Sequence, residues 1–250
     1  MFERAKLSES LTVHLAREVV SGRMNPGDMM PTEADLSARF GVSKAIIREC
    51  IQVLAGLGVI HAQQGKRSVI LPRSDWNIVS PSLQEAFILE DQGPQLSSQF
   101  HDVRLLLEPA AAAWAAERAD DDNISNLLAL AQTMAALADG HTDPVRDLSP
   151  GYMEADIAFH LGILQSARND VMLGLLHGFR GLLRTAFQRV DGHYIVKGSK
   201  EHTLIAEAVA SHDANEAQRL MLYHLSTAQN VAVDGRWASK ADEPTLSVRN

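Results

Sequence analysis

Residues 31–57 constrain the fold more than any other part of this sequence, because they predict two short helices joined by a tight turn. Leu36 and Phe40 are four residues apart, so they share one face of the first helix. Gly41 follows where a helix end favours a left-handed residue, and Ser43 can cap the next helix with its side-chain oxygen. The pattern predicts a helix-turn-helix, whose second helix enters the major groove of DNA.

Cationic side chains occupy the parts of this region that could face DNA. Lys44 and Arg48 are four residues apart near the start of the second helix. Gly58 ends that helix, and short apolar runs on either side of a Gly-containing turn predict a β-hairpin. Lys66 and Arg67 lie at the tip of the hairpin, so the sequence predicts a winged helix-turn-helix.

Residues 8–71 resemble the winged-helix DNA-binding domain of the GntR family of bacterial transcription regulators. The resemblance is carried by Pro26-Gly27, Pro31-Thr32-Glu33, Leu36, Gly41-Val42-Ser43, Arg48-Glu49, Leu54, Gly58 and Gly65. In that family a serine, the next basic residue, a later arginine and the wing glycine meet the DNA. The resemblance therefore implies a DNA-binding set of Ser43, Lys44, Arg48, Gln64, Gly65 and Lys66. Lys44 replaces the usual arginine, which removes a two-bond contact to guanine and puts the operator sequence in question.

The charge of the chain is divided between its two parts. The net charge is −8, but residues 1–73 hold ten Lys/Arg and seven Asp/Glu, a balance of +3, which leaves −11 for the remainder. The basic balance coincides with the expected DNA-reading helix. No apolar run is long enough to span a membrane, no signal peptide is evident, and Cys50 is the single cysteine. We therefore expect a cytoplasmic protein without a membrane partner.

The rest of the chain shows helical signals without a competing strand pattern. The expected fold class is mostly α, with the N-terminal winged helix-turn-helix followed by an all-α antiparallel helical bundle. Helices are expected at about 97–119, 121–138, 150–167, 170–190, 199–211 and 213–234. The expected division is a DNA-binding domain at 1–73, a linker with a short helix at 74–94, an effector-binding and dimerisation domain at 95–235 and a disordered tail at 236–250.

Four side chains of the bundle could converge on a metal ion. Asp156 and His160 are four residues apart and stack on one helix face. His202 lies before the turn between the last two helices, and His224 follows that turn by a similar number of residues. The two side chains therefore lie at a comparable depth in the bundle. One oxygen and three nitrogen ligands suit zinc, nickel or another first-row divalent ion such as manganese. The chain has ten histidines, and the plainer interpretation is that these are ordinary, locally bonded residues.

A second resemblance favours the metal. Asp156-Ile-Ala-Phe-His160, Glu201-His202 and His224 resemble the FCD effector domain of the FadR branch of GntR regulators, in which these positions hold a metal in many members. Arg104 and Glu108 match an R-x-x-x-E pattern of that domain. Arg104 is therefore the first candidate to bind the carboxylate of an effector with two bonds. Arg184 is the second candidate and Arg180 a further one.

These observations together predict a ligand-responsive transcription regulator rather than an enzyme. We expect a homodimer that binds double-stranded operator DNA, represses a catabolic operon and senses a small organic acid, such as a sugar acid. The sequence contains no HExxH motif and no nucleophile constellation. Two other classes were weighed: a metal-dependent enzyme with an attached DNA-targeting domain, and a nucleoid or scaffolding protein that binds DNA without sequence preference.

Overall fold

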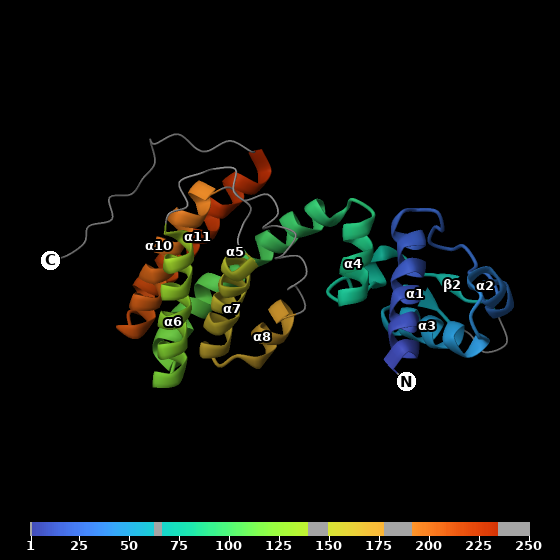
Figure 1. The fold of residues 1–250 in the computed structure, drawn as a ribbon, viewed down its shortest axis with the longest axis horizontal. Coiled ribbons are helices and arrows are strands. Elements are labelled where there is room, and N and C mark those ends of the chain that lie inside the picture. Colours follow the sequence, from blue (N-terminus) through green and yellow to red (C-terminus); the bar gives the residue numbers. More distant parts are fainter. Residues whose placement is uncertain (1, 63–66, 140–149, 178–191, 235–250) are drawn as a thin grey trace. The chain divides into compact units, whose positions relative to one another are not determined.

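The chain is mainly helical, with one small antiparallel sheet (Figure 1). The structure is a computed structural model that describes residues 2–62, 67–139, 150–177 and 192–234. The chain divides into two compact units, the first over residues 1–97 and the second over most of the remainder. The expected mostly-α fold class is confirmed.

Local side chains set the boundaries of the helix-turn-helix in the first unit. Its helices are α1 (Phe2–Val20), α2 (Glu33–Phe40) and α3 (Lys44–Gly56). Thr32 caps α2 by accepting a hydrogen bond from the Asp35 N–H, and the Asp35 carboxylate accepts one from the Thr32 N–H. Gly41 ends α2 at a φ of 66°, and Ser43 caps α3. Both predicted helices of the motif are therefore present.

The core of this unit lies where the three helices meet. Helices α1 and α2 both pack against α3. Leu36 of α2 and Ile47 and Leu54 of α3 are completely buried, as is Leu15 of α1. Burying an aliphatic side chain of this size stabilises a fold by about 1.5–3 kcal/mol. This packing fixes the direction in which the exposed face of α3 points.

The wing follows α3 and consists of β1 (Ile60–His61) and β2 (Val69–Ile70). The two strands are antiparallel, with Ile60 opposite Ile70, and Met29 adds a single bridge to Val69. The predicted hairpin is confirmed. The expected tip residues Gln64, Gly65 and Lys66 lie outside the described residues.

The predicted linker is ordered and belongs to the first unit. After a short 3-10 turn, η1 (Arg73–Asp75), comes helix α4 (Pro81–Leu89), which packs against α1 and has Leu83 and Phe87 completely buried. The Arg17 guanidinium donates a 2.8 Å hydrogen bond to the carboxylate of Glu90. Helix α4 of the linker therefore packs against α1 and forms part of the first unit.

The second unit contains helices only, within the residues that the structure describes. They are α5 (Gly93–Arg118), α6 (Asp121–Ala138), α7 (Pro150–Ser166), α8 (Asp170–His177), α10 (Gly192–Ala210) and α11 (Ala214–Asp234). Helix α6 lies beside α7 and α10, and α10 lies beside α11 (Figure 1). Helix α10 begins well before the predicted start at 199, which adds about two helical turns ahead of the candidate site. No helix among the described residues is long and apolar enough to cross a membrane.

Candidate metal centre and DNA-reading surface

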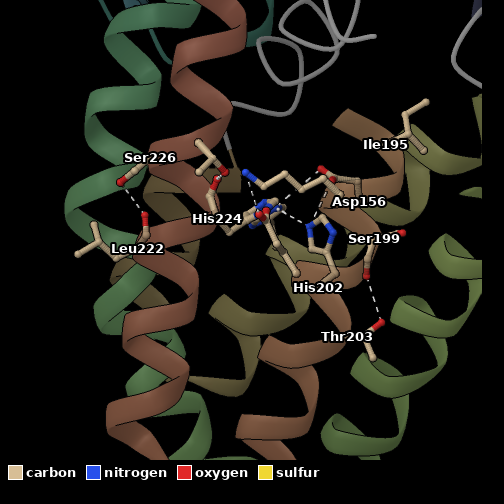
Figure 2. Close-up of polar contacts among 12 residues, drawn as sticks. Asp156, Ile195, Ser199, His202, Thr203, Leu222, His224 and Ser226 are labelled. Carbon is tan, nitrogen blue, oxygen red and sulfur yellow. Dashed lines mark hydrogen bonds and ion pairs between the residues drawn. The ribbon is translucent and has the colours of Figure 1, made fainter. Parts of the chain in front are cut away.

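The four predicted metal ligands come together inside the second unit. Asp156 and His160 lie on α7, His202 on α10 and His224 on α11. Each is at most 3% exposed, and their potential ligand atoms all lie within 4.8 Å of one another. Figure 2 shows Asp156, His202 and His224 pointing toward one another. Helices α7, α10 and α11 thus bring four polar side chains together at one buried place.

The donor atoms have the separations that a metal ion would need. His160 Nε2 lies 3.3 Å from His202 Nε2, and His202 Nε2 lies 3.2 Å from Asp156 Oδ1. Two nitrogens that each bind zinc at its usual bond length in tetrahedral geometry are roughly 3.3 Å apart. The donor set therefore fits a divalent ion in chemistry and in spacing.

Burial keeps His160 and His202 in the neutral state that binds metals. Burial lowers the pKa of His202 well below its usual value, and the neighbouring His224 and His160 lower it further. Burial also lowers the pKa of His160, although Glu108 opposes the shift. Burial raises the pKa of the Asp156 carboxyl, and His160 opposes that shift. Neutral imidazoles offer a nitrogen lone pair, which a protonated ring does not.

Arg104, the first effector candidate, lies on α5 next to this cluster and is engaged by Glu108. Its Nε lies 2.6 Å from Glu108 Oε1, and its second contact to the same carboxylate is 3.3 Å long. Burial would raise the pKa of Glu108, but Arg104 and His160 hold it well below its usual range. A carboxylate from an effector would therefore share or replace the Glu108 contact. Arg184, the second candidate, and Arg180 lie outside the described residues.

Sequence reasoning noted Glu108 and Glu201 only as parts of the family patterns and left His101 as an ordinary residue, so it gave none of the three a role at the metal site. Glu108 Oε2 lies 2.7 Å from His160 Nδ1, and Glu201 Oε2 lies 2.8 Å from His224 Nδ1. His101, one turn before Arg104, has a buried Nε2 without a hydrogen-bond partner among the described residues. Burial lowers the pKa of His101 to about 4. The spacing of His101, Arg104 and Glu108 along one helix face was a further signal in the sequence for the first and last of these residues.

The predicted DNA-reading residues of α3 are exposed. Ser43, Lys44 and Arg48 all lie on the open side of the helix, and the Arg48 side chain is 64% exposed. Ser43 accepts a hydrogen bond from the Ile46 N–H, so its own hydroxyl hydrogen stays available to donate. The Arg48 Nε donates to Glu33 at 2.8 Å. An exposed pair of this kind contributes little to stability, so Arg48 can exchange it for a DNA contact.

Two protein-family models match the chain and together cover most of it. The model for bacterial regulatory proteins of the gntR family matches residues 7–70, and the FCD domain model matches residues 99–227, which is just over half of the chain. The first match contains the helix-turn-helix and the wing. The second contains all four residues of the candidate metal centre.

Individual proteins are similar over nearly the whole chain. The galactonate operon transcriptional repressor of Escherichia coli is 29% identical over 86% of this chain and 92% of that protein. The transcriptional repressor NanR of Klebsiella aerogenes is 25% identical over 90% of this chain and 84% of that protein. The solved structure of Lar, which controls the Listeria monocytogenes agr system, has a TM-score of 0.60 at 17% identity, covering 90% of this chain and 95% of Lar. That likeness concerns the fold alone.

Proposed function

Because the chain belongs to the GntR family of bacterial regulatory proteins and carries an FCD domain, we propose that it is a homodimeric repressor of a catabolic operon, released from its operator by a small organic acid. The observation that carries this proposal is the buried four-donor cluster in the domain that follows the helix-turn-helix. Burying one carboxylate and three imidazoles at one point costs free energy, which a bound divalent ion would offset.

The first unit supplies the DNA contacts in this proposal. Ser43 and Lys44 open the recognition helix α3 with exposed polar groups, and Arg48 follows one turn later. Arg48 would bind guanine or phosphate, while Lys44 would act as a point charge. Gln64, Gly65 and Lys66 of the wing complete the proposed set. In a dimer, two such helices would read the half-sites of a near-palindromic operator.

Asp156, His160, His202 and His224 would hold the metal, for which zinc is the first choice and nickel or manganese the others. When bound, the ion supplies a positive charge that can accept oxygens of an acidic ligand. The four residues would hold that charge at a fixed, buried position. We therefore assign the metal a binding role and propose no catalytic reaction.

The charges at the site support an anionic effector. Asp156, Glu108 and Glu201 contribute three negative charges, and Arg104 and Lys197 contribute two positive ones, so these groups sum to −1. A divalent ion changes the sum to +1, which an effector carboxylate would neutralise. Arg104 would bind that carboxylate, and Arg184 remains the second candidate. Galactonate is a sugar-acid anion, so the similarity to the galactonate operon repressor favours a sugar acid as the effector.

Release of the operator requires the effector to distinguish two states of the protein. If the acid binds the arrangement that does not fit the operator more tightly than the one that does, it shifts the population away from DNA binding. An acid that bound both arrangements equally would leave repression unchanged.

A thermal-shift screen of sugar acids and short carboxylic acids, each with and without a metal chelator, tests the proposal. A true effector raises the melting temperature because it binds the folded form, and the chelator should abolish that rise. The same acid should release the protein from an operator selected out of random DNA, measured by fluorescence anisotropy. Turnover of the acid by the metal-loaded protein would favour an enzyme instead. Equal binding to selected and random DNA would favour a nucleoid protein.

A further inference from the structure

Glu201 lies directly behind one of the proposed metal ligands. Its Oε2 is 2.8 Å from His224 Nδ1, and the two side chains are 7% and 2% exposed. The other oxygen of Glu201 is 3.8 Å from Lys197 Nζ and has no hydrogen-bond partner among the described residues. Burying a carboxylate with so little compensation costs free energy. A metal ion bound to His224 would add positive charge near Glu201 and offset that cost.

Glu108 stands in the same relation to a second ligand. Its Oε2 lies 2.7 Å from His160 Nδ1, while Arg104 engages the whole carboxylate. The contact to His160 is short but bent away from the ideal hydrogen-bond direction. Glu108 therefore acts on His160 mainly through its charge, whereas Glu201 acts on His224 through an aligned hydrogen bond.

A carboxylate fixes which ring nitrogen of its histidine carries the hydrogen. A carboxylate accepts hydrogen bonds and does not donate them, so in the hydrogen bond to Glu201 the donor must be His224 Nδ1. The lone pair of a neutral imidazole is then on Nε2, the nitrogen available to a metal. His160 Nε2 does lie on the inner side, 3.3 Å from His202 Nε2. The same tautomer would aim the His224 lone pair at the cluster.

We propose that Glu201 and Glu108 are positioning residues of the metal centre: Glu201 holds His224 as the Nδ1–H tautomer through its hydrogen bond, Glu108 favours the same tautomer of His160 through its charge, and both leave Nε2 free to bind the ion. This inference rests on the metal site of the proposed function. Hydrogen-bonded partners outside the ligand set typically contribute about 10–100-fold to metal affinity.

Glu201→Gln tests the proposal, with Glu207→Gln as the matched control. The introduced glutamine keeps the size of the side chain but can also donate to Nδ1, which would stabilise the wrong tautomer. Glu207 lies on the same helix and is exposed. In competition with a chelator of known affinity, Glu201→Gln should bind zinc about 10–100-fold more weakly than the unmodified protein. Glu207→Gln should bind zinc as the unmodified protein does.

A structural role for Glu201 would give a different pattern. It would lower the melting temperature of the metal-free protein, whereas a positioning role mainly reduces the rise in melting temperature that zinc produces. Nitrogen-15 NMR of the histidines in metal-free protein reads the tautomer directly. The signal of His224, assigned by its loss in His224→Ala, should show hydrogen on Nδ1 in the unmodified protein. Hydrogen on Nε2 would overturn the proposal even if Glu201→Gln failed to fold.

The outcomes separate this inference from the proposed function. Zinc binding that is equal in Glu201→Gln and the unmodified protein overturns the positioning role and leaves the metal-binding repressor intact. Absence of zinc, nickel and manganese binding in the unmodified protein overturns both. A loss of affinity confined to Glu201→Gln supports both.

Discussion

At the scale of single residues, the burial of an ion pair decides how easily its charged side chains can change partners. Arg48 and Arg104 are both paired with glutamates, yet Arg48 is 64% exposed and Arg104 is buried. An exposed pair is screened by water and is easily exchanged. A buried pair is not, because breaking it leaves an uncompensated charge. Arg48 can thus exchange its glutamate for a DNA contact, whereas an effector anion would have to compete with Glu108 for Arg104.

Arg48→Ala should strongly weaken selective operator binding while leaving the fold intact. Loss of a base-contacting arginine costs about 1–3 kcal/mol of binding free energy. Anisotropy titrations with operator and random DNA at one salt concentration measure the effect. The control is Arg219→Ala, which removes an exposed arginine of α11. Operator affinity that survives Arg48→Ala would show that other residues of the protein read the operator.

His202→Ala should remove bound metal, because His202 is completely buried at the centre of the donor set. The loss of zinc affinity should exceed the roughly 10–100-fold that outer partners of metal ligands contribute. Metal analysis after gel filtration gives the stoichiometry, and His61→Ala of the exposed wing strand is the control. Full metal occupancy in His202→Ala would exclude this residue from the site.

At the scale of elements, local sequence signals define each helix but not its neighbours. Thr32, Gly41 and Ser43 mark the ends of α2 and α3 as their chemistry predicts. The linker helix was also predicted, but its docking on α1 was not. That docking brings Glu90 to Arg17, two residues that are far apart in the sequence. Pairing at such a distance leaves no periodic signal.

Gly58→Ala should destabilise the first unit, because this glycine joins the recognition helix to the wing. Its φ is +71°, and an added Cβ would lie 2.1 Å from the backbone oxygen of Asp75. Strain and overpacking together should cost roughly 2–5 kcal/mol. Thermal unfolding followed by circular dichroism measures the loss. Gly56→Ala is the matched control, since an added Cβ there meets nothing within 4 Å. Equal melting temperatures for the two variants would contradict this account.

At the scale of the whole molecule, function requires the two units to influence each other. Residues 1–73 carry a balance of +3 and the remainder −11, so DNA attracts only the first part. The second part carries the buried cluster of Asp156, His160, His202 and His224. In the proposed function, regulation is a coupling free energy between the two parts of the chain.

That coupling must be reciprocal. If the effector weakens operator binding by a given factor, within about 5–150-fold for typical regulators, the operator must weaken effector binding by the same factor. Calorimetric titration of the effector, with and without saturating operator DNA, measures the second factor. Unequal factors would mean that a further state or a further bound species takes part.

The sequence by itself determined the helix-turn-helix, the wing, the succession of helices and the candidate ligands Asp156, His160, His202 and His224. These follow from capping residues, helical periodicity and distance along a helix, which act within a few turns of chain. The tertiary structure decided that Glu108 contacts His160, that Glu201 supports His224 and that the linker helix joins the first unit. Such contacts join residues on different helices or different helical turns, where side-chain direction and burial choose one partner among many that the sequence allows.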